Sequence, residues 1–194
     1  MEKVAKSLTD YIIGKGMIEN EDREIYEYGF QIATEVGLFI LFCLVTTLHL
    51  HMYMEAIMFF IIFVPLRSYA GGLHLEKYHS CLILSCLTFC GVLLIVRYIQ
   101  VSFYFSFIVL LILEYWVFRL YPVENLNRKV DDEENRYFKK KLVAFLLLDL
   151  LIAIACIILH NSSGIFMITV TFTIVMVTMV IGKYKNKRDL HLRN

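Results

Sequence analysis

Long apolar runs dominate this sequence and leave few options for its fold. Hydrophobic residues make up 59% of the 194 positions, whereas roughly 45–50% is usual in soluble domains. A helix needs about 20 mostly apolar residues to cross a bilayer, and the chain holds about six such stretches. We therefore predict an all-α fold: a polytopic membrane helical bundle of about six spans, with little chain left for a soluble domain.

The polar interruptions set the expected boundaries of these spans. The first two are joined by the short link His49-Leu50-His51-Met52, which predicts a tight antiparallel hairpin. Pro65 is expected to end the second span, because the residue before a proline is biased away from helical geometry. The polar segment 123–141 is predicted to be a solvated loop with room for a short helix. Spans two and three are short enough to be re-entrant. The expected spans are 30–50, 52–66, 82–98, 103–120, 142–159 and 165–181.

The N-terminal segment, residues 1–28, is polar and amphipathic. We predict it to be part of a single integral membrane domain covering residues 1–194. Apolar residues at helical spacing on one face, with lysines on the others, are typical of a helix in the membrane interface, and Gly14-Lys15-Gly16 is expected to break that helix. A solvated cytoplasmic arm fits the pattern equally well. The apolar positions are Val4, Leu8, Tyr11 and Ile12.

The basic residues predict the orientation in the membrane. All of the 19 lysines and arginines except Arg97 fall on one side of the predicted spans. Since cytoplasmic loops carry the excess of Lys and Arg, both termini and the segment 67–81 are expected on the cytoplasmic side of the cell membrane. The net charge of +1 gives no reason to expect nucleic acid as a partner.

The five cysteines predict neither a disulfide framework nor a metal site. Their number is odd and four lie in apolar runs, where cysteine usually packs as a small hydrophobic residue. No CxxC pair or Cys/His set with zinc spacing is present. We therefore expect no metal and no cofactor.

The segment 65–81 is the polar interruption that carries chemistry. A cysteine peptidase needs a thiol and a base, and Cys81 and His74 are the natural pair. Seven residues on a straight helix separate two side chains by about 10.5 Å, so these two cannot meet on one unbroken helix. Gly71-Gly72 offers a loop that folds His74 back over the start of span three, with Cys81 in its first turn. Unpaired N–H groups there would favour a thiolate and could serve an oxyanion.

Other polar residues near this segment have weaker cases. Arg67 could bind an acidic group of a substrate or hold the loop, and positive-inside anchoring explains it equally well. Glu76 could orient His74 only in a tight turn. Glu35, near the cytoplasmic end of span one, is better placed to reach the loop than Asp149. We expect Asp149, near mid-depth in span five, to be a neutral, hydrogen-bonded structural acid facing the bundle interior.

The run Arg67-Ser68-Tyr69-Ala70-Gly71-Gly72-Leu73-His74, followed by Cys81, resembles the signature of the accessory gene regulator B (AgrB) family. That signature is a basic residue, then Ala-Gly-Gly-x-His, six residues and Cys. The length, the multiple spans, the short polar N-terminus and the basic tail are also similar. The resemblance implies an integral membrane cysteine endopeptidase of bacterial peptide quorum sensing.

On this resemblance, Cys81 is the nucleophile and His74 the base, while Arg67, Gly71 and Gly72 shape the site. The substrate would be a small AgrD-like precursor peptide at the inner-leaflet lipid. Its C-terminal tail would be removed through a thioester on Cys81, and cyclisation would give a thiolactone or lactone. A homodimer is plausible. The competing interpretation is a non-enzymatic membrane transporter or sensor component, in which Glu35, Glu114 and Asp149 line a path and residues 67–81 form a gate.

Overall fold

The computed structural model describes residues 2–72, 78–122 and 132–193, and helices form all of the regular structure in these ranges. Six of the helices are long and apolar enough to cross a membrane, which confirms the predicted all-α fold with six spans. The helices are α1 (Glu2–Gly14), a 3₁₀ turn η1 (Asn20–Asp22), α2 (Arg23–Leu50), α3 (Tyr53–Ala70), α4 (Tyr78–Tyr98), α5 (Phe103–Leu120), α6 (Asp132–Ile158) and α7 (Ser162–Arg193).

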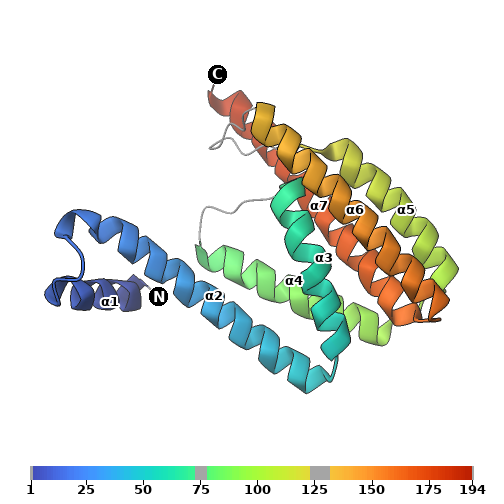
Figure 1. The fold of residues 1–194 in the computed structure, drawn as a ribbon, viewed down its shortest axis with the longest axis horizontal. Coiled ribbons are helices and arrows are strands. Elements are labelled where there is room, and N and C mark those ends of the chain that lie inside the picture. Colours follow the sequence, from blue (N-terminus) through green and yellow to red (C-terminus); the bar gives the residue numbers. More distant parts are fainter. Residues whose placement is uncertain (1, 73–77, 123–131, 194) are drawn as a thin grey trace. The chain divides into compact units, whose positions relative to one another are not determined.

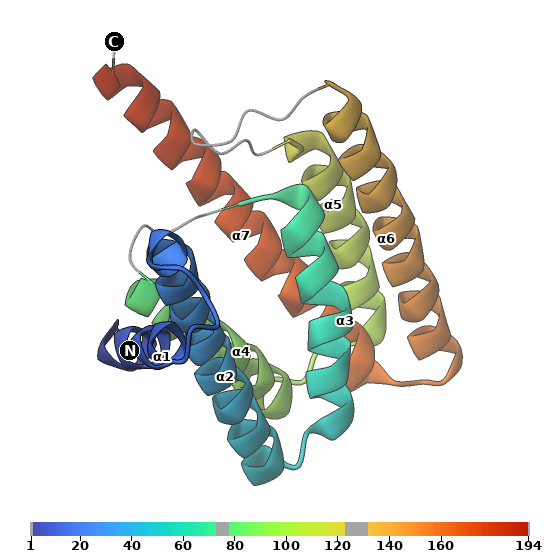
Figure 2. The ribbon, with the colours of Figure 1, turned by 60° about the vertical axis from the view of Figure 1, so that its left-hand side comes forward.

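The chain divides into two compact units, each described here by itself. Unit 1 comprises Met1–Leu50 and Glu76–Leu87, and unit 2 comprises His51–Leu75 and Thr88–Asn194. The single domain expected from the sequence therefore stays a prediction. In unit 2, α7 packs against α3, α5 and α6, as Figures 1 and 2 show. Its buried side chains, among them Ile168, Phe172 and Val175, form the centre of the core.

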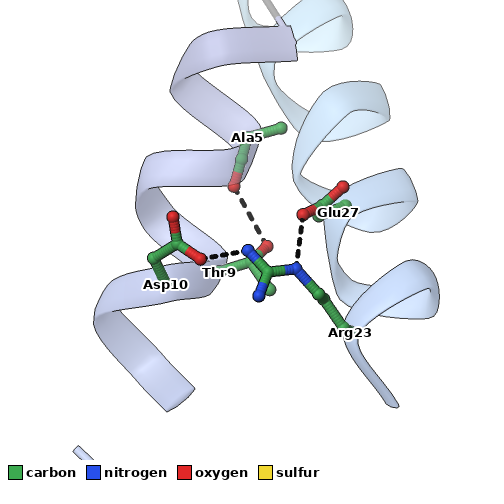
Figure 3. Close-up of polar contacts among 5 residues, drawn as sticks. All are labelled: Ala5, Thr9, Asp10, Arg23 and Glu27. Carbon is green, nitrogen blue, oxygen red and sulfur yellow. Dashed lines mark hydrogen bonds and ion pairs between the residues drawn. The ribbon is translucent and has the colours of Figure 1, made fainter. Parts of the chain in front are cut away.

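In unit 1, α1 packs along the start of α2. Arg23 at the beginning of α2 forms an ion pair with Asp10 of α1, and its Nε donates to Glu27 Oε1 at 3.0 Å (Figure 3). Thr9, which is fully buried, donates to the carbonyl of Ala5 at 3.0 Å within α1. The predicted break follows, with Gly16 at φ +67°. Helix α1 is therefore held to α2 by both packing and charge.

Helix α3 continues past Pro65 to Ala70, so the prediction that Pro65 ends this span is wrong. A proline removes one N–H donor, but membrane helices tolerate this where neighbouring helices pack around the segment. Leu66 and Ala70, beyond the proline, are 0% and 1% exposed, so tertiary burial favours continued helix. Ser68 Oγ donates to the carbonyl of Val64 at 2.8 Å within the same turn. As a result, Arg67 lies on a helix rather than in a loop.

Helix α6 begins at Asp132, well before the apolar run, so the second half of the predicted loop 123–141 is helical. The start of α6 is tied to the end of α5 by Tyr121, whose hydroxyl donates to Asn135 Oδ1 at 2.6 Å and lies 3.1 Å from its carbonyl. Burial raises the pKa of the Tyr121 phenol above its ordinary value, which keeps that donor protonated. The same extension occurs in the basic tail, where α7 runs on to Arg193.

The turn between α6 and α7 is built from the predicted polar residues. His160 has φ +53°, and Asn161 N–H donates to the carbonyl of Cys156 at 2.8 Å, closing the end of α6. Asn161 Oδ1 accepts the N–H of Gly164 at 2.9 Å, the bond of a helix N-cap. These bonds join two helices of the unit 2 core.

Candidate active site

Two glycines end α3 in a backbone geometry that side chains disfavour. Gly71 has φ +80° and Gly72 has φ +142°, and residues with a Cβ rarely adopt positive φ. Just before them, the ring of Tyr69 stacks on Phe145 of α6 with centroids 5.5 Å apart. The chain therefore leaves a firmly packed helix end in a direction that only the glycine pair allows without strain.

A side chain on Gly72 would have to displace the guanidinium of Arg67. A Cβ on this buried residue would overlap Nη1 of Arg67 and stand 3.0 Å from its Cζ and 3.3 Å from Thr178 Oγ1. Real Cβ atoms essentially never lie closer than 3.0 Å to another heavy atom, so the end of the Arg67 side chain would have to move. The half-buried guanidinium of Arg67 and the Gly72 backbone are thus in direct contact, and Thr178 of α7 lies next to Gly72.

The sequence did not single out Thr178 as part of this group. Its position in a series of threonines predicts only packing and bonding within its own helix, and its hydroxyl does donate to the Val175 carbonyl at 2.8 Å. Its closeness to Gly72 arises from the packing of α3 against α7. No local pattern in the sequence could have revealed it, because more than a hundred residues separate the two positions.

Cys81 is the fourth residue of α4, in its first turn, as the sequence predicts. Its side chain is exposed, and the N–H groups of a first turn have no carbonyl partner within the helix. These are the surroundings in which a thiol can react with a substrate carbonyl and in which backbone donors can stabilise negative charge.

The other cysteines are less accessible. Cys43 and Cys156 are buried, and Cys86 and Cys90 are half-buried; all are free thiols. Among the residues that the structure describes, no cluster of three or more His, Cys, Asp or Glu side chains could hold a metal ion. Accessibility therefore singles out Cys81 as the candidate nucleophile.

Glu35 lies in α2 and is 9% exposed. Its Oε1 atom is buried and has no hydrogen-bond partner within the described part of the chain. A buried carboxyl oxygen without a partner is costly, so a donor at this position would stabilise the protein. This burial is compatible with the supporting role expected for Glu35.

The structure brings together Arg67, Gly72 and Thr178, all in unit 2, with Gly71 adjacent in the chain. Cys81 and Glu35 belong to unit 1. His74, like Glu76, lies outside the described residues, so the predicted Cys81–His74 pair stays a prediction. What the geometry provides is a fixed exit from α3 and an accessible thiol at the beginning of α4.

Comparison with known proteins shows the family of this chain. The model of the family described as accessory gene regulator B matches residues 5–181. Two Clostridium perfringens proteins named as AgrB-like are similar: AgrB-like protein 2 of strain 13 and the AgrB-like protein of strain SM101. Each is 26% identical over 172 residues, covering 84% of this chain and 80% of the relative. No solved structure matches. Since the family match extends over most of the chain and includes the segment 67–81, this protein belongs to the accessory gene regulator B family.

Proposed function

We propose that this protein is a membrane-embedded cysteine endopeptidase that processes an AgrD-like autoinducer precursor peptide. Cys81 is the nucleophile and His74 the general base. The observation that carries the proposal is the exposed thiol of Cys81 in the first turn of α4, which follows the Gly71-Gly72 exit from α3 in a chain of this family. Membership of the family favours this function over the transporter alternative.

The first half of the reaction forms a thioester. His74 accepts the proton of the Cys81 thiol, and the sulfur attacks the carbonyl carbon of the scissile peptide bond. First-turn N–H groups of α4 stabilise the oxyanion. The C–N bond then breaks, His74 donates its proton to the leaving amine, and the C-terminal tail departs. The N-terminal part of the precursor stays on Cys81 as an acyl-enzyme.

The second half closes the ring. A thiol or hydroxyl of the bound peptide attacks the thioester carbonyl, its proton passes to the departing Cys81 sulfur, and a thiolactone or lactone is released. The thioester on Cys81 preserves the energy needed for ring closure, so cyclisation needs no external energy source. Direct hydrolysis of the precursor would not preserve that energy, which is why a thiol nucleophile suits this reaction.

The residues around the glycine pair set the direction in which the chain leaves α3 on its way to His74. The contact between Gly72 and the Arg67 guanidinium fixes where the chain leaves α3, and Glu35 is the candidate for orienting the base. Arg67 can also bind a carboxylate of the precursor, because guanidinium forms paired hydrogen bonds with such groups.

The distribution of basic residues supports a reaction at the cytoplasmic side of the cell membrane. All Lys and Arg except Arg97 lie on the side of the predicted spans that carries residues 67–81. There a thiol remains reduced, and a precursor peptide held at the inner leaflet can reach it. The proposal includes a homodimer because a second copy would shield polar residues within the spans.

The test is reconstitution of the purified protein in liposomes with a precursor peptide from the same genome, followed by mass spectrometry of the peptide. Wild type, Cys81→Ala, His74→Ala and the control Cys90→Ala are compared. We expect wild type and the control to remove the C-terminal tail, and both site variants to leave the precursor intact while their circular dichroism stays helical.

Cleavage by a folded Cys81→Ala variant would contradict the proposal. So would failure of the wild type with a precursor that matures in cells expressing this protein. A His74→Ala variant that retains wild-type rates would leave Cys81 as nucleophile and remove His74 from the mechanism.

A further inference from the structure

The first turns of α6 carry a dense group of positive charges. Arg136, Lys139, Lys140 and Lys141 lie within six residues that include no acidic side chain, and all four are exposed. None of the four forms an ion pair with a described residue. Arg136 and Lys140 are four residues apart on the helix, where like charges repel each other. An anion bound between them would remove this repulsion.

Two aromatic rings lie under the neighbouring lysines. Lys139 Nζ is 5.5 Å from the ring centroid of Phe118 on α5, and Lys141 Nζ is 5.6 Å from that of Tyr137. Both distances are in the range of cation–π attraction. Tyrosine and lysine side chains are common at the level of lipid headgroups. The beginning of α6, beside the end of α5, therefore combines positive charge with the aromatic residues typical of a membrane interface.

One exposed stripe of α6 continues from these charges into the apolar part of the helix. Asp149, the only charged residue in the run 142–158, is 1% exposed and faces the interior of unit 2, as expected from the sequence. The stripe therefore has a basic end, an apolar length and no charged group between them. At helical spacing after Arg136 and Lys140, its apolar side chains, between 36% and 63% exposed, are Val143, Leu147, Leu151 and Ile154.

The stripe has the depth of one membrane leaflet. Eleven residues separate Lys140 from Leu151, and eleven residues of α-helix rise about 16 Å. The hydrocarbon core of a bilayer is about 30 Å thick, so one leaflet contributes about 15 Å. Helix α6 is long and apolar enough to cross a membrane, so its exposed apolar face meets lipid chains. With Lys140 at the headgroups, the acyl chains of that leaflet reach down to Leu151.

We propose that this face of α6, beside Phe118 of α5, is a binding site for an anionic phospholipid. Arg136 and Lys140 bind the phosphate, and the acyl chains lie along the apolar stripe. Clusters of basic residues next to a membrane span bind acidic headgroups, and guanidinium forms paired hydrogen bonds with phosphate. Glu133, three residues before Arg136, is exposed and forms no ion pair with a described residue, so the face stays net positive.

The same charges select an anionic lipid over a zwitterionic one. The positive choline group of phosphatidylcholine would add to the repulsion between Arg136 and Lys140, whereas the headgroup of phosphatidylglycerol adds no positive charge. The site depends only on groups of α5 and α6, so it is independent of the chemistry at Cys81.

The experiment measures which lipid lies next to position 143 in the full-length protein. The reporter variant Trp116→Phe/Val143→Trp has a single tryptophan, on the stripe and about one turn from Lys140. Nanodiscs contain phosphatidylcholine and phosphatidylglycerol, and either the one or the other lipid carries the bromine atoms that quench tryptophan fluorescence. We expect phosphatidylglycerol to be enriched near position 143 on the order of fivefold over its bulk share, and this enrichment to fall with added salt.

A matched pair of variants in the reporter protein locates the charges responsible. Arg136→Gln/Lys140→Gln should abolish the enrichment. The control Lys183→Gln/Lys187→Gln removes the same charge from an exposed pair of the same spacing on α7, and it should keep the enrichment. Every substituted side chain is exposed, so all variants should fold like wild type, which circular dichroism checks.

Equal enrichment of the two lipids near position 143 in the reporter protein would overturn the proposal and would show that the basic residues form a solvated face. Loss of the enrichment in the control pair would also overturn it, because the lipid would then respond to the overall charge of the protein. The proposal would fall as well if Arg136→Gln/Lys140→Gln kept the full enrichment, since another group would then hold the lipid.

Discussion

The two sides of the segment 73–77 are built in opposite ways. On the α3 side, the backbone of Gly72 presses against the Arg67 guanidinium with Thr178 close by, and Tyr69 stacks on α6. On the α4 side, Cys81 is exposed in the first helical turn. One side constrains a backbone path, and the other leaves a reactive group accessible. Substitutions before the segment should therefore lower the cleavage rate by changing the backbone geometry. Substitutions after it should lower the rate by removing the reactive group.

The largest effect is expected from Cys81→Ser, which changes one atom and keeps the shape of the side chain. A hydroxyl is a far weaker nucleophile than a thiolate, so we expect the rate of precursor cleavage to fall by about 10³-fold or more. Thermal stability should match wild type because Cys81 is exposed. Mass spectrometry of the peptide and a melting curve of the same sample check both statements. Near-normal cleavage by the serine variant would show that the α4 side does not act through the chemistry of the Cys81 thiol.

Gly72→Ala should give the next largest loss of cleavage rate, because it displaces neighbouring groups instead of removing a reactive one. The added methyl overlaps Arg67 and requires positive φ from an alanine, and a shift of about 1 Å in a positioned group can cost about 10²-fold in rate. The matched control is Gly91→Ala in α4, where a Cβ meets nothing within 4 Å. The control should keep wild-type cleavage. Equal activity in the two alanine variants would show that the α3 side is not geometrically constrained.

Arg67→Lys tests the same contact and should lower the cleavage rate less than Gly72→Ala does. Lysine keeps the charge but loses the planar guanidinium that touches Gly72, and we expect a loss of about tenfold in cleavage rate. Because Nη1 is absent in lysine, the combination with Gly72→Ala should lose less activity than the product of the two single effects. Cleavage rates of the four proteins test this. Strictly multiplicative losses would mean that the two residues act separately.

The smallest effect on cleavage is expected from Asn161→Ala, at the turn between α6 and α7. The variant loses the hydrogen bond to the Gly164 N–H, which should lower the free energy of unfolding by about 1 kcal/mol. The cleavage rate should be unchanged at temperatures well below the midpoint. Denaturant or thermal unfolding measures the first quantity and the liposome assay the second. A large loss of activity without a loss of stability would show that this turn takes part in the site.

The sequence predicts the parts of the fold that depend on local chemistry. Apolar runs locate the six spans, and Gly14–Gly16 marks the end of α1. The start of α4 just before Cys81 also follows from the change from polar to apolar residues. Each of these depends on side chains next to one another in the chain.

The features that the sequence does not predict depend on tertiary packing. Burial of Leu66 and Ala70 carries α3 past Pro65 and places Arg67 on a helix. Packing of α3 on α7 brings Thr178 to Gly72. Local helix and turn propensities cannot predict such contacts, because the partners lie on different helices.

The central claim is tested most directly by the intact mass of the protein after brief incubation with its precursor and rapid acid quenching. The account predicts an added mass equal to the precursor without its C-terminal tail, less one water. The adduct should map to Cys81, be released by hydroxylamine as a thioester, and be missing from Cys81→Ala. An adduct on another residue, or cleavage and cyclisation with no covalent adduct under conditions that trap one in a known thioester-forming enzyme, would contradict it.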